Sequence, residues 1–409
     1  MPLVAGYTVF MKIIRLPREK VMLGLPLPWN VRDAQGLLLL VKGYIVTTEP
    51  QLDNILERGA FVDVEEIRAS TLAVTGSQAP TLAAPPNLFD LWNQTSEILR
   101  LLFNPPQKPL DFLAQLDAFA SHLMVLLDYN VNVAIYRAVR QENAHNFYYG
   151  YTHSVHTAVM CILLARRLGW AQGRMMSLVR AALTMNMSIL ELQGKMAAQD
   201  MPMKDSQRAE IRRHPETTVK LLQKLGVTDS GWLQAIAQHH EHPEGTGYPS
   251  GCNEMSEMAA ALRVTDILMA KISPRALRAS LTPQEAIRHL YKEDRGGALS
   301  TAIIKEFGIY PPGDFVKLVS GELGVVVERT ANAKAPIVAA ITDVAGRAIT
   351  HTVRHDTAQP KFAIVGICMD SDRARCSNDC CRNVSMGSLG WSPRPWPSAC
   401  PSGLGEQLF

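Results

Sequence analysis

The stretch Gln238-His-His-Glu-His-Pro-Glu-Gly-Thr-Gly-Tyr-Pro249 carries the most information in this chain. Its adjacent histidines, His239 and His240, end an apolar run that begins at Trp232. A turn rich in glycine and proline follows at once, and glycine lets backbone approach a bound ligand closely. Imidazole is the commonest protein metal ligand and the usual acid–base group near neutral pH. The stretch therefore predicts a site in which imidazoles stand beside a tight turn.

The pattern resembles the signature of HD-GYP domains, a family of metal-dependent phosphodiesterases that hydrolyse cyclic di-GMP. Other pieces of the family's pattern occur in the family's order. They are Tyr151-Thr-His-Ser154, Arg212-Arg-His-Pro215, Arg263-Val-Thr-Asp266 and Pro274-Arg-Ala-Leu-Arg278. One such piece alone would be a weak signal, but together they make a specific resemblance over residues 130–310. The resemblance implies a helical HD-type domain in that region.

The resemblance also implies a set of site residues. His153, His214, His239, His240 and Asp266 stand at the family's metal-ligand positions, and His153 and Asp266 are also expected to orient water. The implied substrate-binding residues are Gly245, Gly247, Tyr248, Pro249, Arg275 and Arg278. For the two arginines, an exposed charge without phosphate contact is an equally open alternative.

One motif departs from the family. The family reads Ala-Leu-Leu-His-Asp-Ile-Gly-Lys, whereas this chain reads Ala182-Leu-Thr-Met-Asn-Met-Ser-Ile189. In the family the aspartate carboxylate bridges two metal ions, and two neighbouring cations need an anion between them. Asn186 offers an amide oxygen without charge, and the Met185 thioether is a poor match for a hard or borderline metal. Ile189 replaces a lysine that would contact phosphate.

The surviving ligands divide unevenly between the two metal sites that the resemblance implies. The first site keeps only His153 and Asp266. The second site keeps three imidazoles, those of His214, His239 and His240. Three imidazoles with water make a sound site for a catalytic transition metal. We therefore expect about one divalent metal per chain, of the iron, manganese or zinc class, and no stable pair.

Two functions of different classes remain open. The first is cyclic di-GMP signalling by a catalytically impaired module that binds the nucleotide or other signalling proteins. The second is a slow metal-dependent phosphodiesterase that acts on cyclic di-GMP or another phosphoester. The missing carboxylate at Asn186 favours the first function, because the family's paired metals depend on that group.

Composition sets the outer limits. The chain has 409 residues, 47% of them hydrophobic, with a net charge of +3. This length and apolar content predict two or three domains with sizeable cores. The small net charge gives no electrostatic case for binding a nucleic-acid polymer. The sequence contains no run of about 18 uncharged apolar residues, so we expect no membrane span. Charges at Lys12, Arg15 and Lys20 interrupt any secretory apolar core, so we expect a cytoplasmic protein.

The patterning along the chain predicts a mainly α protein, in which the helical HD-type domain is flanked by a small N-terminal α+β domain and a small C-terminal β module. The expected segments are residues 1–70 (N-terminal domain of regulatory type), 71–86 (linker), 87–130 (lead-in helices), 131–310 (HD-GYP-like domain), 311–368 (β module) and 369–409 (disordered tail). Helical spacing of Leu88, Leu91 and Trp92 indicates the lead-in helices. Valine- and isoleucine-rich runs punctuated by glycine indicate the strands.

Overall fold

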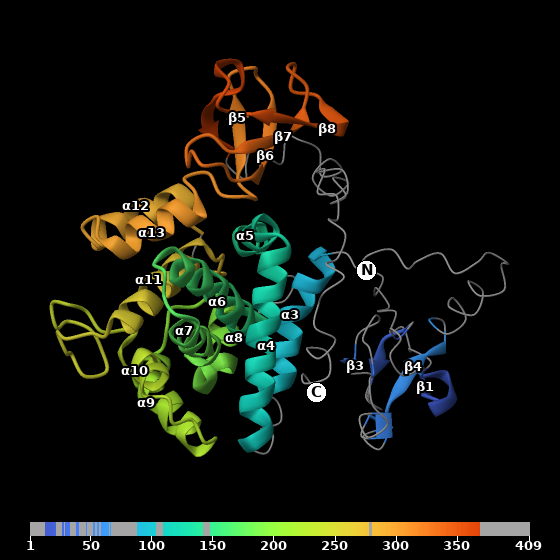
Figure 1. The fold of residues 1–409 in the computed structure, drawn as a ribbon, viewed down its shortest axis with the longest axis vertical. Coiled ribbons are helices and arrows are strands. Elements are labelled where there is room, and N and C mark those ends of the chain that lie inside the picture. The colour runs from blue at the N-terminus through green and yellow to red at the C-terminus, as the bar shows by residue number, and fades with distance from the viewer. Residues whose placement is uncertain are drawn as a thin grey trace, which may run out of the picture. The chain divides into compact units, whose positions relative to one another are not determined.

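The computed structural model describes residues 88–103, 109–141, 148–277 and 280–368, together with short pieces between residues 13 and 66. The chain divides into two units on either side of the Ala84–Pro85 bond. Figure 1 traces both units, coloured from the N-terminus to the C-terminus. The expected linker, residues 71–86, and the expected disordered tail, residues 369–409, lie outside the described residues.

The N-terminal unit contains a small antiparallel sheet with the strand order β1-β4-β2-β3. Its strands are β1 (Ile13–Arg15), β2 (Val31–Arg32), β3 (Leu38–Leu40) and β4 (Phe61–Asp63), and a 3-10 turn, η1, covers Arg18–Lys20. Along β4 the side chains alternate, so that Val62 is fully buried while its two neighbours are half-buried. Val62 packs with Leu27, Trp29 and Leu52 in the core of this unit.

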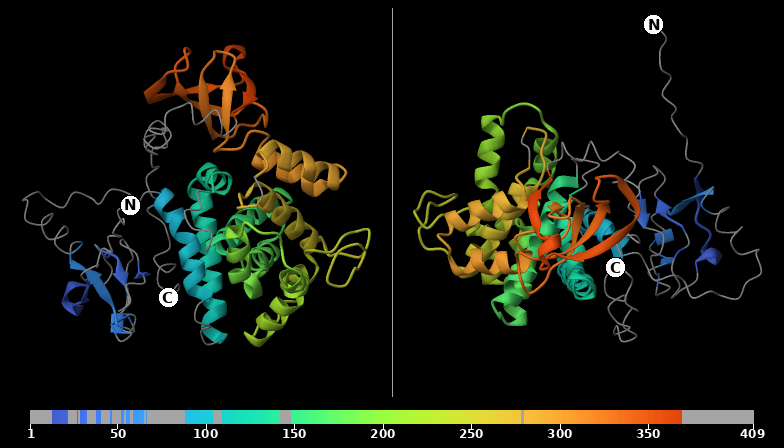
Figure 2. Two further views of the ribbon diagram at one scale, coloured as in Figure 1. Left: turned by 180° about the vertical axis from the view of Figure 1, so that it is seen from behind. Right: turned by 90° about the horizontal axis from the view of Figure 1, so that it is seen from above.

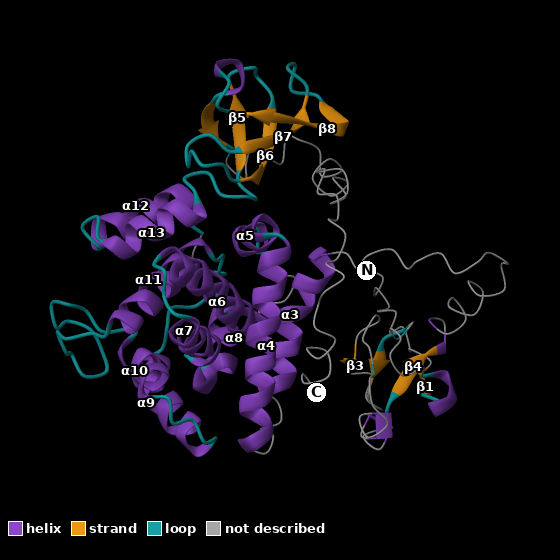
Figure 3. Cartoon of the chain, in the orientation of Figure 1, coloured by secondary structure: helices purple, strands orange, loops and turns teal. Residues whose placement is uncertain are grey.

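The larger unit begins with a helical bundle. Its helices are α3 (Leu88–Phe103), α4 (Pro109–Tyr129), α5 (Val131–Val139), α6 (Tyr149–Arg167), α7 (Gln172–Thr184), α8 (Leu190–Ala198), α9 (Asp205–Lys224), α10 (Ser230–Gln238), α11 (Glu257–Ile272), α12 (Pro283–Glu293) and α13 (Ala298–Phe307). A short 3-10 turn, η3 (Met187–Ile189), joins α7 to α8. Figure 3 distinguishes these helices from the strands of the two sheets.

Helix α6 lies at the centre of the bundle. Nearly every residue from Tyr149 to Ala165 is buried, and a helix that is buried all round belongs to a core. It packs against α3, α7, α8, α11 and α13. This position carries His153, near the start of α6, into the interior of the domain.

The larger unit ends in an antiparallel sheet with the order β8-β7-β6-β5-β9. Its strands are β5 (Phe315–Leu318), β6 (Leu323–Glu328), β7 (Ile337–Thr342), β8 (Ala348–Asp356) and β9 (Ile364–Ile367), with a 3-10 turn, η4, at Pro360–Phe362. Figure 2 shows this sheet from two further sides. Val325, Val326 and Val327 are all buried, so both faces of β6 are covered.

These observations confirm the predicted fold class, a mainly helical chain with a small sheet near each end. Among the described residues, no single helix is both long and apolar enough to span a membrane. Phe112–Tyr129 and Val131–Val139, bent by 107° at their junction, pass that test only when taken together.

Candidate metal and nucleotide site

Two helices bring three histidines together. His214 lies on α9, while His239 and His240 follow the last turn of α10. One nitrogen atom from each ring lies within 4.8 Å of the others. The Nε2 atoms of His214 and His239 are 3.3 Å apart. The three imidazoles that the resemblance assigns to the second metal site therefore converge.

Backbone contacts fix the tautomers of two of these rings. His214 Nδ1 lies 2.5 Å from the Ile211 carbonyl oxygen, and His239 Nδ1 lies 2.6 Å from that of Ile236. A carbonyl oxygen only accepts, so each Nδ1 carries the proton and donates it. Each Nε2 then turns a lone pair toward the cluster.

This donor set fits a transition metal. Two nitrogens bound at about 2.0–2.1 Å to a tetrahedral metal lie roughly 3.3–3.4 Å apart. The 3.3 Å separation between the Nε2 atoms of His214 and His239 agrees with that value. Facing lone pairs at this distance repel one another, and a cation between them removes the repulsion.

Burial keeps the three rings neutral. It lowers the pKa of His214 to about 3, with a further contribution from the charge of His239. Burial also lowers the pKa of His239, and it lowers the pKa of His240 well below its usual value. Neutral imidazole is the form that coordinates metal, so no proton has to leave these rings before binding near neutral pH.

His153 and Asp266 form a separate pair. His153 Nε2 on α6 lies 2.7 Å from Asp266 Oδ1 on α11, and both side chains are buried. Burial acts to raise the pKa of Asp266, but the hydrogen bond and charge of His153 outweigh burial and hold it below its usual value. The two residues that remain of the first metal site implied by the resemblance are therefore hydrogen-bonded to each other. A metal bound there would compete with that hydrogen bond.

The altered motif lies against α9. Met185 and Asn186 follow the last turn of α7, and both are buried. Ser188 Oγ lies 2.8 Å from Thr218 Oγ1 and donates to the His214 carbonyl oxygen at 3.3 Å. Ile189, at the position of the family's lysine, is only 5% exposed. Neutral side chains thus occupy the segment next to the histidine cluster.

Two glycines shape the loop after His240. Gly245 has a φ of +70°, which favours glycine. A Cβ on Gly247 would lie 2.4 Å from the Glu241 Cα and 2.5 Å from the His240 carbonyl oxygen. No side chain fits at that distance, so Gly247 lets the loop fold directly back onto the histidine pair.

The rest of the loop is fixed by Tyr248 and Glu241. The Tyr248 ring stacks on the His240 ring, with centroids 4.6 Å apart and planes 24° apart. Tyr248 N donates to the His240 carbonyl oxygen at 3.1 Å, and the peptide to Pro249 is cis. The buried Glu241 accepts a 2.7 Å hydrogen bond from Ser250 N through Oε1. Of the glycine, tyrosine and proline positions predicted to bind substrate, Gly247 and Tyr248 therefore lie directly against His240.

Of the two arginines predicted to bind phosphate, the structure describes Arg275 but not Arg278. Arg275 donates from Nε and Nη2 to the Tyr149 hydroxyl, at 3.1 and 2.5 Å. The Tyr149 ring stacks on His153, with centroids 5.7 Å apart, so Arg275 reaches the site through a tyrosine. Arg278 lies outside the described residues. Phosphate contact by either arginine stays a prediction.

Sequence reasoning missed three residues that border the site. Tyr149 precedes the Tyr-Thr-His motif by two positions, Glu241 belongs to His-His-Glu, and Arg212 opens Arg-Arg-His-Pro. All three stood inside or next to quoted motifs. Tyr149 contacts Arg275 and Arg212 lies over the ring of Tyr248, so both residues join segments far apart in the chain, and spacing within one segment does not reveal such contacts.

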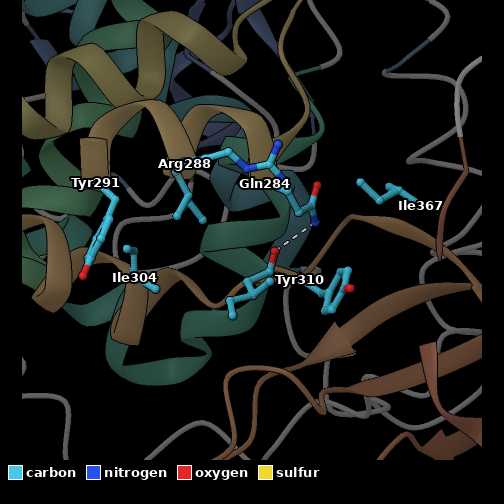
Figure 4. A pocket seen from close by; sticks show the side chains of 8 residues that line it. Gln284, Arg288, Tyr291, Ile304, Tyr310 and Ile367 are labelled. Carbon is cyan, nitrogen blue, oxygen red and sulfur yellow. Dashed lines mark hydrogen bonds between the residues drawn. The ribbon is translucent and has the colours of Figure 1, made fainter. Parts of the chain in front are cut away.

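A separate hollow of about 430 Å³ opens between α12, α13 and β9 (Figure 4). It is lined by Gln284, Ile287, Arg288, Tyr291, Ile304, Ile309, Tyr310 and Ile367. Gln284 Nε2 donates to the Ile309 carbonyl oxygen at 2.9 Å. None of the predicted ligands is among these lining residues, so we place the candidate site at the histidine cluster.

Comparison with known proteins agrees with this placement. Residues 137–297 match the HD domain family. The chain is 32% identical over 191 residues to a cyclic di-GMP phosphodiesterase of Pseudomonas aeruginosa, which covers 44% of this chain and 45% of that protein. It is 30% identical over 137 residues to a 3'3'-cGAMP-specific phosphodiesterase of Vibrio cholerae serotype O1, covering 33% of this chain and 30% of that protein. The matched regions span less than half the length of either relative.

Among solved structures, an HDG"Y"P protein from Bdellovibrio bacteriovorus aligns with 71% of this chain and 96% of its own, at 17% identity and a TM-score of 0.45. The family match spans the region that holds the histidine cluster and the folded-back Gly-Tyr-Pro loop. This region of the chain is therefore similar to HD domains, and the two curated relatives that the chain resembles are named phosphodiesterases.

Proposed function

We propose that this chain is a cyclic dinucleotide signalling protein whose catalytically impaired domain binds its ligand at a one-metal site. The observation that carries the proposal is the cluster of His214, His239 and His240, whose neutral rings converge within 4.8 Å. When bound there, a divalent metal supplies Lewis-acid stabilisation of negative charge on a phosphate. Its identity within the iron, manganese and zinc class is left to experiment.

Catalytic impairment follows from the missing anion. Two unit charges 4 Å apart repel by about 4 kcal/mol at an effective dielectric constant of 20, and two dications by roughly four times as much. In the family pattern, the carboxylate at position 186 offsets that repulsion, whereas Asn186 is neutral. His153 and Asp266 are already bonded to each other at 2.7 Å. These features support one stable metal and argue against a pair.

The remaining residues are suited to hold a nucleotide. Tyr248, stacked on His240, places an aromatic ring at the border of the cluster. Asp266 is an ionised, buried acceptor that can orient a water molecule. These groups bind and orient whether or not a second metal is present, so ligand binding can outlast efficient turnover.

A slow phosphodiesterase is the second candidate. Its support is the intact histidine triad together with the two relatives, both of them named phosphodiesterases. One metal and the Asp266 carboxylate would then suffice for a reduced rate. The substrate would be cyclic di-GMP, a related dinucleotide or another phosphoester.

Calorimetric titration of the metal-loaded chain with cyclic di-GMP separates these candidates when turnover is measured in the same sample. We expect micromolar binding, or about −8 kcal/mol, with little product. A sample stripped of metal by a chelator serves as the control. Steady release of the linear dinucleotide would favour the second candidate. Absence of heat at about 100 μM ligand would contradict nucleotide binding altogether.

A further inference from the structure

A phosphate ligand at this site calls for a cationic side chain. Three positions that could supply it, Ile189, Arg275 and Arg263, do not offer an unengaged positive charge. Ile189 stands where the family has lysine, and it is buried. Arg275 directs two donors to the Tyr149 hydroxyl. Arg263 pairs with Glu293 across the bundle. Among the residues that the structure describes, which do not include Arg278, we therefore looked for another cation beside the histidine cluster.

Arg212 occupies such a place. It is exposed on α9, two residues before His214. Its guanidinium carbon lies 5.4 Å from the centroid of the Tyr248 ring, and that ring stacks on His240. One aromatic ring thus links Arg212 to a candidate metal ligand.

The electrostatics of Tyr248 agree with this proximity. Burial raises the pKa of the Tyr248 hydroxyl, and the nearby Asp266 raises it further, whereas Arg212 acts in the opposite direction. Among the ion pairs formed by the residues that the structure describes, none includes Arg212. Its charge is therefore available to an anionic ligand.

The chemistry of arginine suits a phosphodiester. A guanidinium that lies over an aromatic ring uses its face for that contact, while the N–H donors along its edge stay available. Two parallel N–H donors match two phosphate oxygens, and such charge-assisted bonds are about twice as strong as neutral ones. Tyr248 holds this fork beside the histidines without consuming its donors.

We propose that Arg212 is the phosphate-binding residue at the border of the histidine cluster and sets the affinity of the site for a cyclic dinucleotide. This proposal rests on the proposed function. Arg212 takes part in binding alone, and no bond is made or broken through it. It supplies a positive charge that neither Ile189 nor the engaged Arg275 provides.

The test is calorimetric titration of the metal-loaded full chain with cyclic di-GMP, in four proteins. Wild type is compared with Arg212→Ala, Arg212→Lys and the matched control Arg213→Ala, which removes the adjacent exposed charge on α9. We expect Arg212→Ala to weaken binding by about 10–150-fold. Arg212→Lys should recover part of that loss, because lysine keeps the charge without the fork. Arg213→Ala should stay within about twofold of wild type.

Metal content and melting temperature are measured on the same four samples. If Arg212→Ala and Arg213→Ala bind equally well, the role of Arg212 is overturned while the proposed function stands. Loss of metal from Arg212→Ala also overturns it, since the effect would then act through the histidines. If wild type itself gives no heat, the proposed function fails, and the role of Arg212 fails with it.

Discussion

At the residue scale, the site depends on which nitrogen of each histidine is free. His214 and His239 donate from Nδ1 to backbone carbonyl oxygens, which leaves Nε2 for a metal. His240 completes the cluster, and its ring is held by Tyr248. Removing one of three imidazoles should therefore weaken metal binding far more than removing an exposed histidine.

We predict that His240→Ala lowers metal affinity by at least about 10–100-fold. Loss of a residue that only supports a metal ligand already has an effect of that size, and His240 is itself a candidate ligand. His289→Ala is the matched control, because His289 is exposed on α12. Elemental analysis after dialysis measures the metal content of both variants. Full retention of metal by His240→Ala would show that the cluster is not the metal site.

A second residue-scale prediction concerns the altered motif. The double change Met185→His and Asn186→Asp restores the two side chains that the family places beside the histidines. Hydrolysis of cyclic di-GMP should rise by at least about 10–100-fold, and metal content should rise toward two per chain. Adding His240→Ala to the double variant should abolish that gain. Two bound metals without faster turnover would mean that impairment has another cause.

At the element scale, the loop after α10 depends on Gly247. A Cβ there would meet the Glu241 Cα at 2.4 Å, and backbone atoms cannot yield as a flexible side chain can. Gly247→Ala should therefore destabilise the fold by about 1–3 kcal/mol and weaken metal binding. Gly173→Ala in α7 is the control, because nothing lies within 4 Å of its added Cβ. Equal urea unfolding midpoints for the two variants would contradict the close approach.

Elements were more predictable than contacts. Apolar spacing at Leu88, Leu91 and Trp92 predicted a helix, and α3 covers Leu88–Phe103. Valine-rich runs predicted strands, and β6, which contains Val325 to Val327, covers Leu323–Glu328. Both predictions rest on local periodicity, because the residues that form each pattern are close to one another in the sequence.

The contacts between distant residues in the site could not be predicted from local sequence patterns. His153 and Asp266 are 113 positions apart, and their hydrogen bond depends on how α6 packs against α11. The contact of Arg275 with Tyr149 spans 126 positions. The resemblance identified candidate ligands, but it could not reveal that two of them satisfy each other. Tertiary packing decides such pairings, and periodicity carries no information about it.

At the scale of the whole molecule, buried neutral histidines make stability depend on pH. Burial lowers the pKa of His156 to about 3, with smaller contributions from the charges of Arg137 and His153. The unfolded chain takes up a proton near pH 6.5, whereas the folded chain resists it until about pH 3. Stability is therefore fully present above pH 6.5 and is lost as the pH falls from 6.5 toward 3.

We predict that lowering the pH from 7 to 5 costs metal-free protein about 2 kcal/mol through His156 alone. His156→Gln should remove that share, so its free energy of unfolding should fall less over the same interval. Urea unfolding at the two pH values measures both proteins. Parallel losses in wild type and His156→Gln would contradict a neutral, buried His156.

The central claim is that the domain holds one metal, because three imidazoles converge while Asn186 supplies no bridging charge. The measurement that tests it most directly is the number of tightly bound transition-metal ions per chain in purified protein after exhaustive dialysis. The account predicts about one, and about two for the Met185→His, Asn186→Asp variant. Two tightly bound metals in the wild-type chain would contradict it.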